Sequence, residues 1–481
     1  MRLNTKQISE YTGGSIIVDP IDASKLACGI TWDSRSVSED DLFVALSGET
    51  HDGHAFIDEV LTKGASIVLV SDKLPEKTLF FAQEMGAAII EVSNTYSAVT
   101  DLAREWRHHL RGRVIGITGS SGKTTTKELV KQVLTASFSV VATEGNQNNE
   151  LGVPRTLLMA DPETDYVVVE MGMRGLGQIE ELCEFVKPHI GLITNIGESH
   201  IELLESRENI AKAKAELLAA LPPHEGIAFL NGADPYLCDL KEFGRVEERS
   251  VTTIIYDGTG DQKESATVYA ENISLDNEGR PQFDLIWLDK ETKRTIPAVS
   301  LIVRGLHNVS NAAAAASVGF AVGMDGQTIA DALAKAEPVA GRQRILTTYD
   351  QVTVIDDAYN ANPDSMRASL SMLSAFKVPG KRVVVLGDMG ELGDYAQACH
   401  ESIGSFAATL DIDRLICIGE LSVYIAAAAA KSGLSSDKIT QVDSLSEILK
   451  ELDSYLEPGD VVLVKASHFM GLDRVVGGLV N

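Results

Sequence analysis

A glycine-rich segment that ends in Gly-Lys-Thr points most directly to chemistry. The segment GITGSSGKTTT is entered from the apolar run RVIGIT, and its spacing is G-x-x-G-K-T because Ile117 stands where the longer phosphate-loop pattern has glycine. Glycines let the backbone approach a phosphate closely, the following helix N-terminus attracts the anion, and Lys123 adds a full positive charge. Thr124 would offer its hydroxyl to Mg²⁺. The predicted phosphate-binding residues are Gly119, Ser120, Ser121, Gly122, Lys123, Thr124 and Thr125.

Two further polar residues follow apolar runs downstream of this loop. Glu170 ends the run VVVE, and His200 follows the run IGLITNIG. Open α/β sheets bind ligands at the carboxyl ends of their parallel strands, so both side chains are expected at the edge that carries the phosphate loop. A carboxylate, an imidazole and the Thr124 hydroxyl could converge there on metal ions that bridge ATP phosphates. Either residue alone would more often be an ordinary surface or core residue, and it is the combination that favours a catalytic site.

Parallel sheets are needed to position these residues, and the apolar runs indicate three of them. DLFVAL, SIVLV and AAIIEV come first, RVIGIT, DYVVVEMG and HIGLITNIG follow, and VTVIDDA, RVVVLGD, RLICIG and DVVLVKAS come last. Runs that are apolar throughout are typical of strands covered on both faces. A chain of 481 residues also exceeds one ordinary core.

The predicted fold class is therefore α/β, in three domains. Residues 1–94 form a small N-terminal α/β domain, and residues 95–337 form a central P-loop ATPase-like domain with a mostly parallel sheet. Residues 338–481 form a C-terminal Rossmann-like α/β domain. A more irregular β-rich insert is expected at about residues 250–303 of the central domain.

Composition excludes several classes of protein. The net charge is -27, which disfavours sequence-independent attraction to nucleic acid or to an anionic membrane. An anionic substrate would need a local basic site. The first residues contain no apolar core of signal-peptide length, and the alanine-rich runs are too short to span a bilayer, so a cytoplasmic protein is expected. The five scattered cysteines contain no Cys-x-x-Cys pair and are expected to be reduced thiols.

Eight segments in colinear order resemble the Mur ligases of peptidoglycan synthesis, relatives of folylpolyglutamate synthetase. The segments are GITGSSGKTTT, TEGNQNNELGVP, EMGM, NIGESHIE, GLHNVSNAAAA, AGRQR, DDAYNANPDSM and LGDMGELG. The resemblance covers most of the chain and implies ATP-dependent amide formation, in which ATP phosphorylates a carboxylate and an amine attacks the acyl phosphate. The motifs are most similar to those of the member that adds D-alanyl-D-alanine to a UDP-N-acetylmuramoyl-tripeptide. The implied ligands are these two substrates, ATP and Mg²⁺. A monomer is expected, but the sequence alone does not determine the oligomeric state.

The resemblance also implies roles for the central residues. Lys123 would steady the transferring γ-phosphoryl group, Thr124 and Glu170 would hold one Mg²⁺, and His200 would hold a second. Family members carry a carbamylated lysine after this histidine. The best positional match is Lys214, with Lys212 as a competitor, although both could be surface lysines of a helix. Asn146, Asn148 and Asn149 would lie beside the phosphates and the acceptor carboxylate.

Other motifs resemble parts of the family's ATP site. Asn308 and Asn311, three residues apart on one helical face, match the adenine position. Arg342 matches an arginine that reaches the phosphates from the third domain. The ribose-side motif contains Asp357, Tyr359, Asn360 and Asn362. Because these residues come from two domains, closure around ATP is expected before chemistry.

The two ends of the chain resemble substrate-binding regions. The segment TWDSRSVSEDDLFVALSGETHDGHAFI resembles the part that binds the uridine diphosphate, with Ser34, Arg35, Gly53 and His54 as candidates. Near the other end, Lys465 and Ser467 are expected to contact substrate. Two departures from the family pattern occur. Ser199 precedes the metal-site histidine where alanine is common, and VKASH stands where Lys-Gly-Ser-Arg is expected.

Three alternatives compete with this interpretation. The sibling ligase that adds the third amino acid usually carries Asp-Asn-Pro-Arg, which is absent here. Folylpolyglutamate synthetase generally lacks the N-terminal segment. From another class, a P-loop NTPase switch would hydrolyse ATP to change shape, but it would leave His200 and the asparagine cluster unexplained. The sequence does not distinguish lysine from diaminopimelate as the third residue of the acceptor peptide.

Overall fold

The computed structural model describes residues 1–48, 51–289 and 292–480. The chain divides into two compact units. The first contains Met1–Gly116, Phe138–Gly172 and Ile179–Ile190. The second contains Ile117–Ser137, Met173–Gln178 and the described residues from Gly191 onward. These units are defined by the compactness of the chain and do not test the predicted domains. The domain boundaries after residues 94 and 337 therefore remain predictions.

The first unit begins with a five-stranded sheet of order β2-β7-β6-β5-β4. Strands β4 to β7 are parallel neighbours, whereas β2 runs antiparallel to β7. The sequence IVLV of β6 is buried at every position, as expected for a strand covered on both faces. The bounds are β2 Ser15–Val18, β4 Gly29–Thr31, β5 Asp41–Val44, β6 Ile67–Val70 and β7 Ala88–Glu91, with helices α1 Thr5–Thr12, α2 Ile57–Thr62 and α3 Glu76–Met85. The short strands β1 Leu3–Asn4 and β3 Leu26–Ala27 pair separately.

The rest of the first unit carries the strand that ends in Glu170. Strands β8, β10 and β9 are neighbours, and β9 and β10 are parallel. All five residues of β10 are buried, including Glu170 itself. Strand β8 starts in this unit, and its last residues, Ile117 and Thr118, belong to the second unit. The bounds are α4 Thr95–Arg107, β8 Arg113–Thr118, β9 Val140–Ala142, α6 Gly152–Met159, β10 Tyr166–Glu170 and α7 Gln178–Val186.

The second unit begins with the helix of the phosphate loop and a run of neighbouring strands, β11 to β16. Strands β12, β13 and β14 are parallel, and β14, β15 and β16 are antiparallel, so the predicted β-rich insert is present. The strand bounds are β11 Ile190–Ile193, β12 Ile227–Asn231, β13 Thr252–Asp257, β14 Val268–Leu275, β15 Pro281–Asp289 and β16 Thr292–Ser300. The helix bounds are α5 Lys123–Thr135, α8 Ile201–Leu204, α9 Arg207–Ala219, α10 Leu237–Phe243, α11 His307–Ala321 and α12 Gly326–Leu333. The alanine-rich α11 packs on α5, because small side chains let two helices approach closely.

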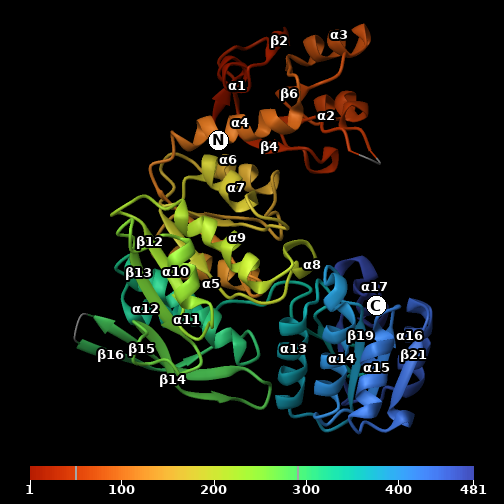
Figure 1. The fold of residues 1–481 in the computed structure, drawn as a ribbon. Helices are drawn as coiled ribbons and strands as arrows, with labels where there is room; N and C mark the ends of the chain where they lie inside the picture. Colours follow the sequence, from red (N-terminus) through yellow and green to blue (C-terminus); the bar gives the residue numbers. More distant parts are fainter. Residues whose placement is uncertain (49–50, 290–291, 481) are drawn as a thin grey trace. The chain divides into compact units, whose positions relative to one another are not determined.

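A six-stranded sheet of order β17-β18-β22-β19-β20-β21 completes the second unit and is drawn in blue in Figure 1. All its pairs are parallel except β17 with β18. The strand bounds are β17 Arg344–Thr347, β18 Thr353–Asp356, β19 Arg382–Gly387, β20 Arg414–Ile418, β21 Ile439–Val442 and β22 Val461–Lys465. The helix bounds are α13 Pro363–Ala375, α14 Ala396–Ala407, α15 Ser422–Lys431, α16 Leu445–Tyr455 and α17 Asp473–Val480. The adjacent strands β18 and β22 therefore bring two candidate site segments together at their carboxyl ends.

Among the helices of residues 1–48, 51–289 and 292–480, none has the length and apolar character needed to cross a membrane.

Candidate active site

The glycine-rich loop adopts the strand, turn and helix arrangement that a phosphate site requires. Gly119 and Gly122 have φ angles of 151° and 75°, and Gly122 directly precedes α5. A Cβ atom at Gly119 would lie 1.8 Å from the Oγ1 atom of Thr194, and one at Gly122 would lie 2.8 Å from the Oδ1 atom of Asn311. Both positions therefore require glycine, for conformation and for space.

The segment that leads to His200 holds this loop in place. The backbone N–H of Ser121 donates to the side-chain oxygen of Asn195 at 2.9 Å, and the Ser120 hydroxyl accepts from the backbone of Gly197 at 2.8 Å. The Lys123 ammonium donates to the Gly119 carbonyl at 2.6 Å. Asn195 was not among the residues predicted from the sequence, although it lies within a motif that carries the resemblance.

His200 and Lys214 lie in the electrostatic neighbourhood of Lys123. Burial lowers the pKa of His200, Glu391 opposes this effect, and the charges of Lys123 and Lys214 reinforce it. The Nδ1 atom of His200 lies 2.5 Å from an oxygen of Glu391. Burial also lowers the pKa of Lys214 well below its usual range, and the charge of Lys123 lowers it further. The second unit thus brings Lys123, His200 and Lys214 together, and Glu391 is a neighbour that the sequence did not single out.

The two candidate lysines differ sharply in environment. Lys214 is 1% exposed, whereas the Lys212 side chain is 42% exposed and its ammonium lies 2.7 Å from Glu208, one helical turn away. Lys214 combines burial with a strongly lowered pKa. The structure therefore separates the two candidates and favours Lys214.

The candidate ligand atoms of the second unit can be compared with the ligands that Mg²⁺ prefers. Thr124 is buried at the start of α5 and offers a hydroxyl oxygen, while His200 offers an imidazole nitrogen. The amine of Lys214 would not suit a cation, because a hard metal ion prefers anionic oxygen donors. Carbamylation of this buried amine would replace it with such a donor. With that modification, the residues fit Mg²⁺.

In the first unit, Glu170 lies beside the asparagine cluster. The Nδ2 atom of Asn148 donates to the Glu170 carboxylate at 2.8 Å, and the backbone N–H of Glu170 donates to the Thr143 hydroxyl at 3.0 Å. The Asn149 side chain accepts from the Gly152 backbone at 3.0 Å at the start of α6. The carbonyl of Asn146 accepts from the backbone N–H of Asn148 at 2.8 Å. A buried carboxylate that is held by an asparagine suits a hard metal ion, so Glu170 also fits the predicted role.

The two asparagines of α11 pair as their spacing predicts. The Asn311 amide donates to the Asn308 side chain at 2.7 Å, and the Asn308 amide donates to the Arg304 carbonyl at 2.6 Å. Thr126 of α5 donates to Asn311 at 3.1 Å. Both asparagines are buried and connect α11 to the helix of the phosphate loop. Their predicted contact with adenine stays a prediction.

Lys465 and Ser467 support the ribose-side motif. The Lys465 ammonium lies 2.7 Å from the Asp357 carboxylate and donates to the Asn360 carbonyl at 2.8 Å, and its side chain is only 2% exposed. The Ser467 hydroxyl donates to the Ala361 carbonyl at 3.3 Å. The structure thus joins two predicted substrate residues to the predicted ATP motif at the ends of β22 and β18.

The buried ion pair leads to a stability prediction. Lys465→Met should lower the free energy of unfolding by about 3 kcal/mol or more, because it leaves the Asp357 carboxylate buried without its cation. Adding Asp357→Asn should recover part of the loss. Urea unfolding followed by circular dichroism measures both, with the exposed Lys450→Met as the control. A cost for Lys465→Met no larger than that of the control would contradict the importance of the pair.

The remaining residues of the third predicted domain occupy defined positions. The Arg342 guanidinium lies 4.5 Å from the centroid of the Tyr359 ring. The Asn360 side chain accepts from the backbone of Ala361 at 2.9 Å, and the Asn362 side chain caps α13. The Asn362 amide also donates to the Ser199 hydroxyl at 2.6 Å. Ser199, a departure from the family pattern, thus makes a contact that alanine could not make.

The predicted uridine diphosphate residues lie in the first unit. Ser34 and Arg35 belong to the 3-10 helix Ser34–Ser36, and Asp33 caps it. The Arg35 guanidinium forms two hydrogen bonds with the Asp33 carboxylate and lowers its pKa to about 2. The Arg35 side chain is 85% exposed. An incoming diphosphate would therefore compete with Asp33 for this guanidinium.

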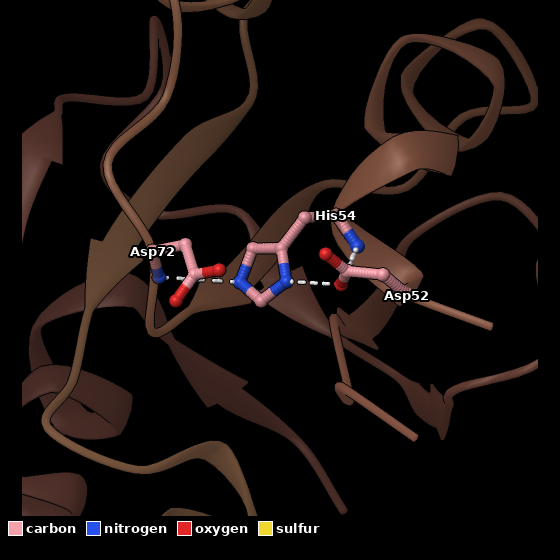
Figure 2. A group of neighbouring side chains, drawn as sticks. All are labelled: Asp52, His54 and Asp72. Atoms are coloured by element: carbon pink, nitrogen blue, oxygen red, sulfur yellow. Dashed lines mark hydrogen bonds and ion pairs between the residues drawn. The ribbon is translucent and has the colours of Figure 1, made fainter. Parts of the chain in front are cut away.

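His54 joins two loops of the first unit, as Figure 2 shows. Its Nδ1 atom lies 2.7 Å from Asp52, and its Nε2 atom accepts from the backbone N–H of Ser71 at 3.0 Å. Asp52, His54 and Asp72 have the proximity of a metal site. Because a neutral imidazole has one free lone pair, which the Ser71 N–H occupies, the ring is better suited to bracing the loops. A Cβ atom at the neighbouring Gly53 would lie 2.8 Å from the backbone nitrogen of Leu46, so glycine permits this close approach.

Comparison with known proteins covers nearly the whole chain. Residues 28–107 match the Mur ligase family catalytic domain, residues 117–319 match the Mur ligase middle domain, and residues 341–468 match the Mur ligase glutamate ligase domain. The chain is 37% identical over 514 aligned residues to the UDP-N-acetylmuramoyl-tripeptide–D-alanyl-D-alanine ligase of Mycobacterium bovis, covering 100% of this chain and 98% of that protein.

Solved structures agree with these matches. The fold is similar to MurF from Acinetobacter baumannii, with a TM-score of 0.81 and 29% identity, covering 100% of this chain and 99% of the other. It is also similar to MurF ligase from Thermotoga maritima in complex with ADP, with a TM-score of 0.73 and 28% identity, covering 94% and 97% of the two chains. The predicted three-domain α/β fold class is confirmed. The chain belongs to the Mur ligase family.

Proposed function

We propose that this protein joins D-alanyl-D-alanine to UDP-N-acetylmuramoyl-tripeptide with conversion of ATP to ADP and phosphate, in the synthesis of peptidoglycan precursors. The observation that carries the proposal is the 37% identity, over the full chain, to a ligase named for these two substrates. The phosphate loop and the grouping of Lys123, His200 and Lys214 support the ATP-dependent part. The proposal includes a cytoplasmic enzyme that acts as a monomer.

The chemistry requires activation of the tripeptide carboxylate, which is a poor electrophile. One carboxylate oxygen attacks the γ-phosphorus of ATP, the bond to the bridging oxygen breaks, and ADP leaves. The amine of D-alanyl-D-alanine then attacks the carbonyl carbon of the acyl phosphate and loses a proton. Inorganic phosphate leaves with the former carboxylate oxygen, and an amide bond remains.

Lys123 and the backbone N–H groups of its loop would stabilise the charge of the transferring phosphoryl group. Thr124, Glu170, His200 and Lys214 are the residues that would hold Mg²⁺. When bound, Mg²⁺ would neutralise negative charge on the ATP phosphates. The amine of Lys214 is suited to carbamylation, because burial favours its neutral form, which attacks CO₂ and then loses a proton to give an anionic carbamate.

The other candidates are assigned to five parts of the ligands. Asn308 and Asn311 would bind adenine, and Arg342, Asp357, Tyr359, Asn360 and Asn362 would bind the ribose and phosphates. Ser34, Arg35, Gly53 and His54 would bind the uridine diphosphate, and Asn146, Asn148 and Asn149 would lie near the acceptor carboxylate. Lys465 and Ser467 would act near the incoming dipeptide through the segment from Asp357 to Ala361, which they hold.

A substrate-dependence assay tests this proposal. Phosphate release from ATP should require both the UDP-linked tripeptide and D-alanyl-D-alanine, and it should be measured separately with lysine and diaminopimelate as the third residue. Equal release without either substrate would indicate a P-loop NTPase switch. Release that depends on a UDP-linked dipeptide and a free diamino acid would indicate the sibling ligase instead.

A further inference from the structure

Ser199 connects the phosphate loop to the start of α13 through two hydrogen bonds. Its hydroxyl donates to the Ser120 carbonyl at 3.1 Å and accepts from the Asn362 amide at 2.6 Å. All three residues belong to the second unit, and Ser199 is 79 positions from Ser120 and 163 from Asn362. A single hydroxyl therefore bridges the glycine-rich loop, the segment after β11 and the ribose-side motif.

Backbone groups at the two ends of this bridge fix the direction of each hydrogen bond. The Oδ1 atom of Asn362 accepts from the backbone N–H of Ser365 at 2.8 Å, so the amide nitrogen is the atom that donates to Ser199. The Ser120 carbonyl can only accept, so the Ser199 hydroxyl proton points to it. Hydrogen bonds aligned in this way polarise and strengthen one another.

The peptide bond between Ser120 and Ser121 is held on both sides by the segment after β11. Ser199 donates to its carbonyl, and its N–H donates to the Asn195 side chain at 2.9 Å. The carbonyl and N–H of a trans peptide point in opposite directions, so the two contacts together fix the orientation of the peptide plane. This peptide lies between the two glycines of the loop, where backbone orientation determines which groups face a phosphate.

Close packing brings the start of α13 to the same short segment. A Cβ atom at Gly197 would lie 2.0 Å from the Oδ2 atom of Asp364, in the first turn of α13, and 3.3 Å from the Cβ atom of Ser120. The absence of a side chain at Gly197 thus lets α13 and the phosphate loop approach this segment together. The bridge through Ser199 forms two residues further along.

We propose that Ser199 is a positioning residue that holds the Ser120–Ser121 peptide and the start of α13 in one arrangement, so that the phosphate loop and the ribose-side motif bind ATP as a single site. The inference rests on the proposed function, in which these two motifs bind ATP. It gives a role to a serine that stands where the family pattern commonly has alanine. It also gives Asn362 a role at the nucleotide site that requires no contact with the ribose.

The first test compares nucleotide and dipeptide. Ser199→Ala should raise the dissociation constant of ADP, measured by calorimetry with Mg²⁺ present, about 5-fold, as expected for the loss of a hydrogen-bonded bridge. The KM for ATP should rise by a similar factor, whereas the KM for D-alanyl-D-alanine should stay essentially unchanged. Ser199→Thr keeps the hydroxyl and should bind ADP nearly as well as the unaltered protein. The matched control is Ser402→Ala, which removes a half-buried hydroxyl that donates to the Cys399 carbonyl at 2.7 Å within α14.

The outcomes of this test separate the inference from the proposed function. An affinity for ADP that Ser199→Ala weakens no more than Ser402→Ala does would overturn the inference alone, provided that the unaltered protein binds ADP. Equal rises in the KM values for ATP and dipeptide would also overturn it, because they would indicate a general disturbance of the fold. If the unaltered protein does not bind ADP, the ATP-dependent part of the proposed function fails as well.

The second test is a double-mutant cycle between Ser199→Ala and Asn362→Ser. The change at position 362 keeps a residue type that caps helices well, but it removes the amide that donates to Ser199. If Asn362 acts through the bridge, the double variant should bind ADP no more weakly than the weaker of the two single variants. If the two effects multiply, the residues act independently, which would indicate a direct contact of Asn362 with ATP and would overturn the proposal.

Discussion

Lys123→Ala should lower the rate of ATP-dependent phosphate release by about 10³-fold or more, because it removes the full positive charge expected at the transferring phosphoryl group. Lys123 is the first residue of α5, and its ammonium donates to the Gly119 carbonyl, so its charge lies beside the phosphate loop. The residues proposed to bind the uridine diphosphate belong to the first unit and lie in other loops. Binding of the UDP-linked tripeptide, measured by calorimetry, should therefore stay close to that of the unaltered protein.

Lys131→Ala is the matched control for this substitution. Lys131 lies on the same helix, and its side chain is 48% exposed and near Glu128. Lys131→Ala removes the same charge from α5 and should leave turnover essentially unchanged. Comparable turnover in Lys123→Ala and Lys131→Ala would refute the assignment of Lys123, and loss of UDP-substrate binding in Lys123→Ala would show that its effect is not local.

Lys214→Ala should lower turnover by about 10²-fold or more, since loss of an anionic ligand removes several kcal/mol of charge stabilisation. We expect this loss at position 214 because the Lys214 side chain is fully buried and its pKa is strongly lowered. Added acetate should restore part of the activity, because a small carboxylate can occupy the space left by the carbamate. Steady-state kinetics with and without acetate measure the effect.

Lys212→Ala provides the comparison for the second substitution. Lys212 lies on the same helix, but its exposed ammonium is paired with Glu208, so its removal should have little effect. Full activity of Lys214→Ala without acetate or bicarbonate would remove the carbamate proposal. A larger loss in Lys212→Ala than in Lys214→Ala would transfer the role to Lys212.

Local sequence was sufficient to predict the elements that carry the phosphate loop. The apolar run before Gly119 and the helix-forming run after Gly122 determine strand, turn and helix over a short stretch, and steric demands explain both glycines. The β-rich insert was also predicted, and its strand β15 begins with alternating polar and apolar residues, whereas β10 is buried throughout.

The contacts between distant segments could not be predicted in the same way. Lys465 meets the Asn360 carbonyl 105 residues away only because β22 pairs beside β18, and strand order is not encoded in either strand alone. The pairing of Glu391 with His200 likewise depends on the packing of two loops. The choice between Lys212 and Lys214 was left open, although Ile210, Leu217 and Leu218 lie three or four residues from Lys214 and place it on the apolar face of α9. The contact between Ser199 and Asn362 gave no local sequence signal, because the two residues are 163 positions apart in the chain.

The central claim is that the γ-phosphoryl group of ATP is transferred to the tripeptide carboxylate before the amide bond forms. The most direct test uses UDP-N-acetylmuramoyl-tripeptide whose terminal carboxylate is labelled with ¹⁸O, together with ATP and D-alanyl-D-alanine. If the carboxylate attacks the γ-phosphorus, each released phosphate must carry one oxygen from that carboxylate, and mass spectrometry of the phosphate will detect it. Phosphate that contains no ¹⁸O, while amide product forms, would contradict the account.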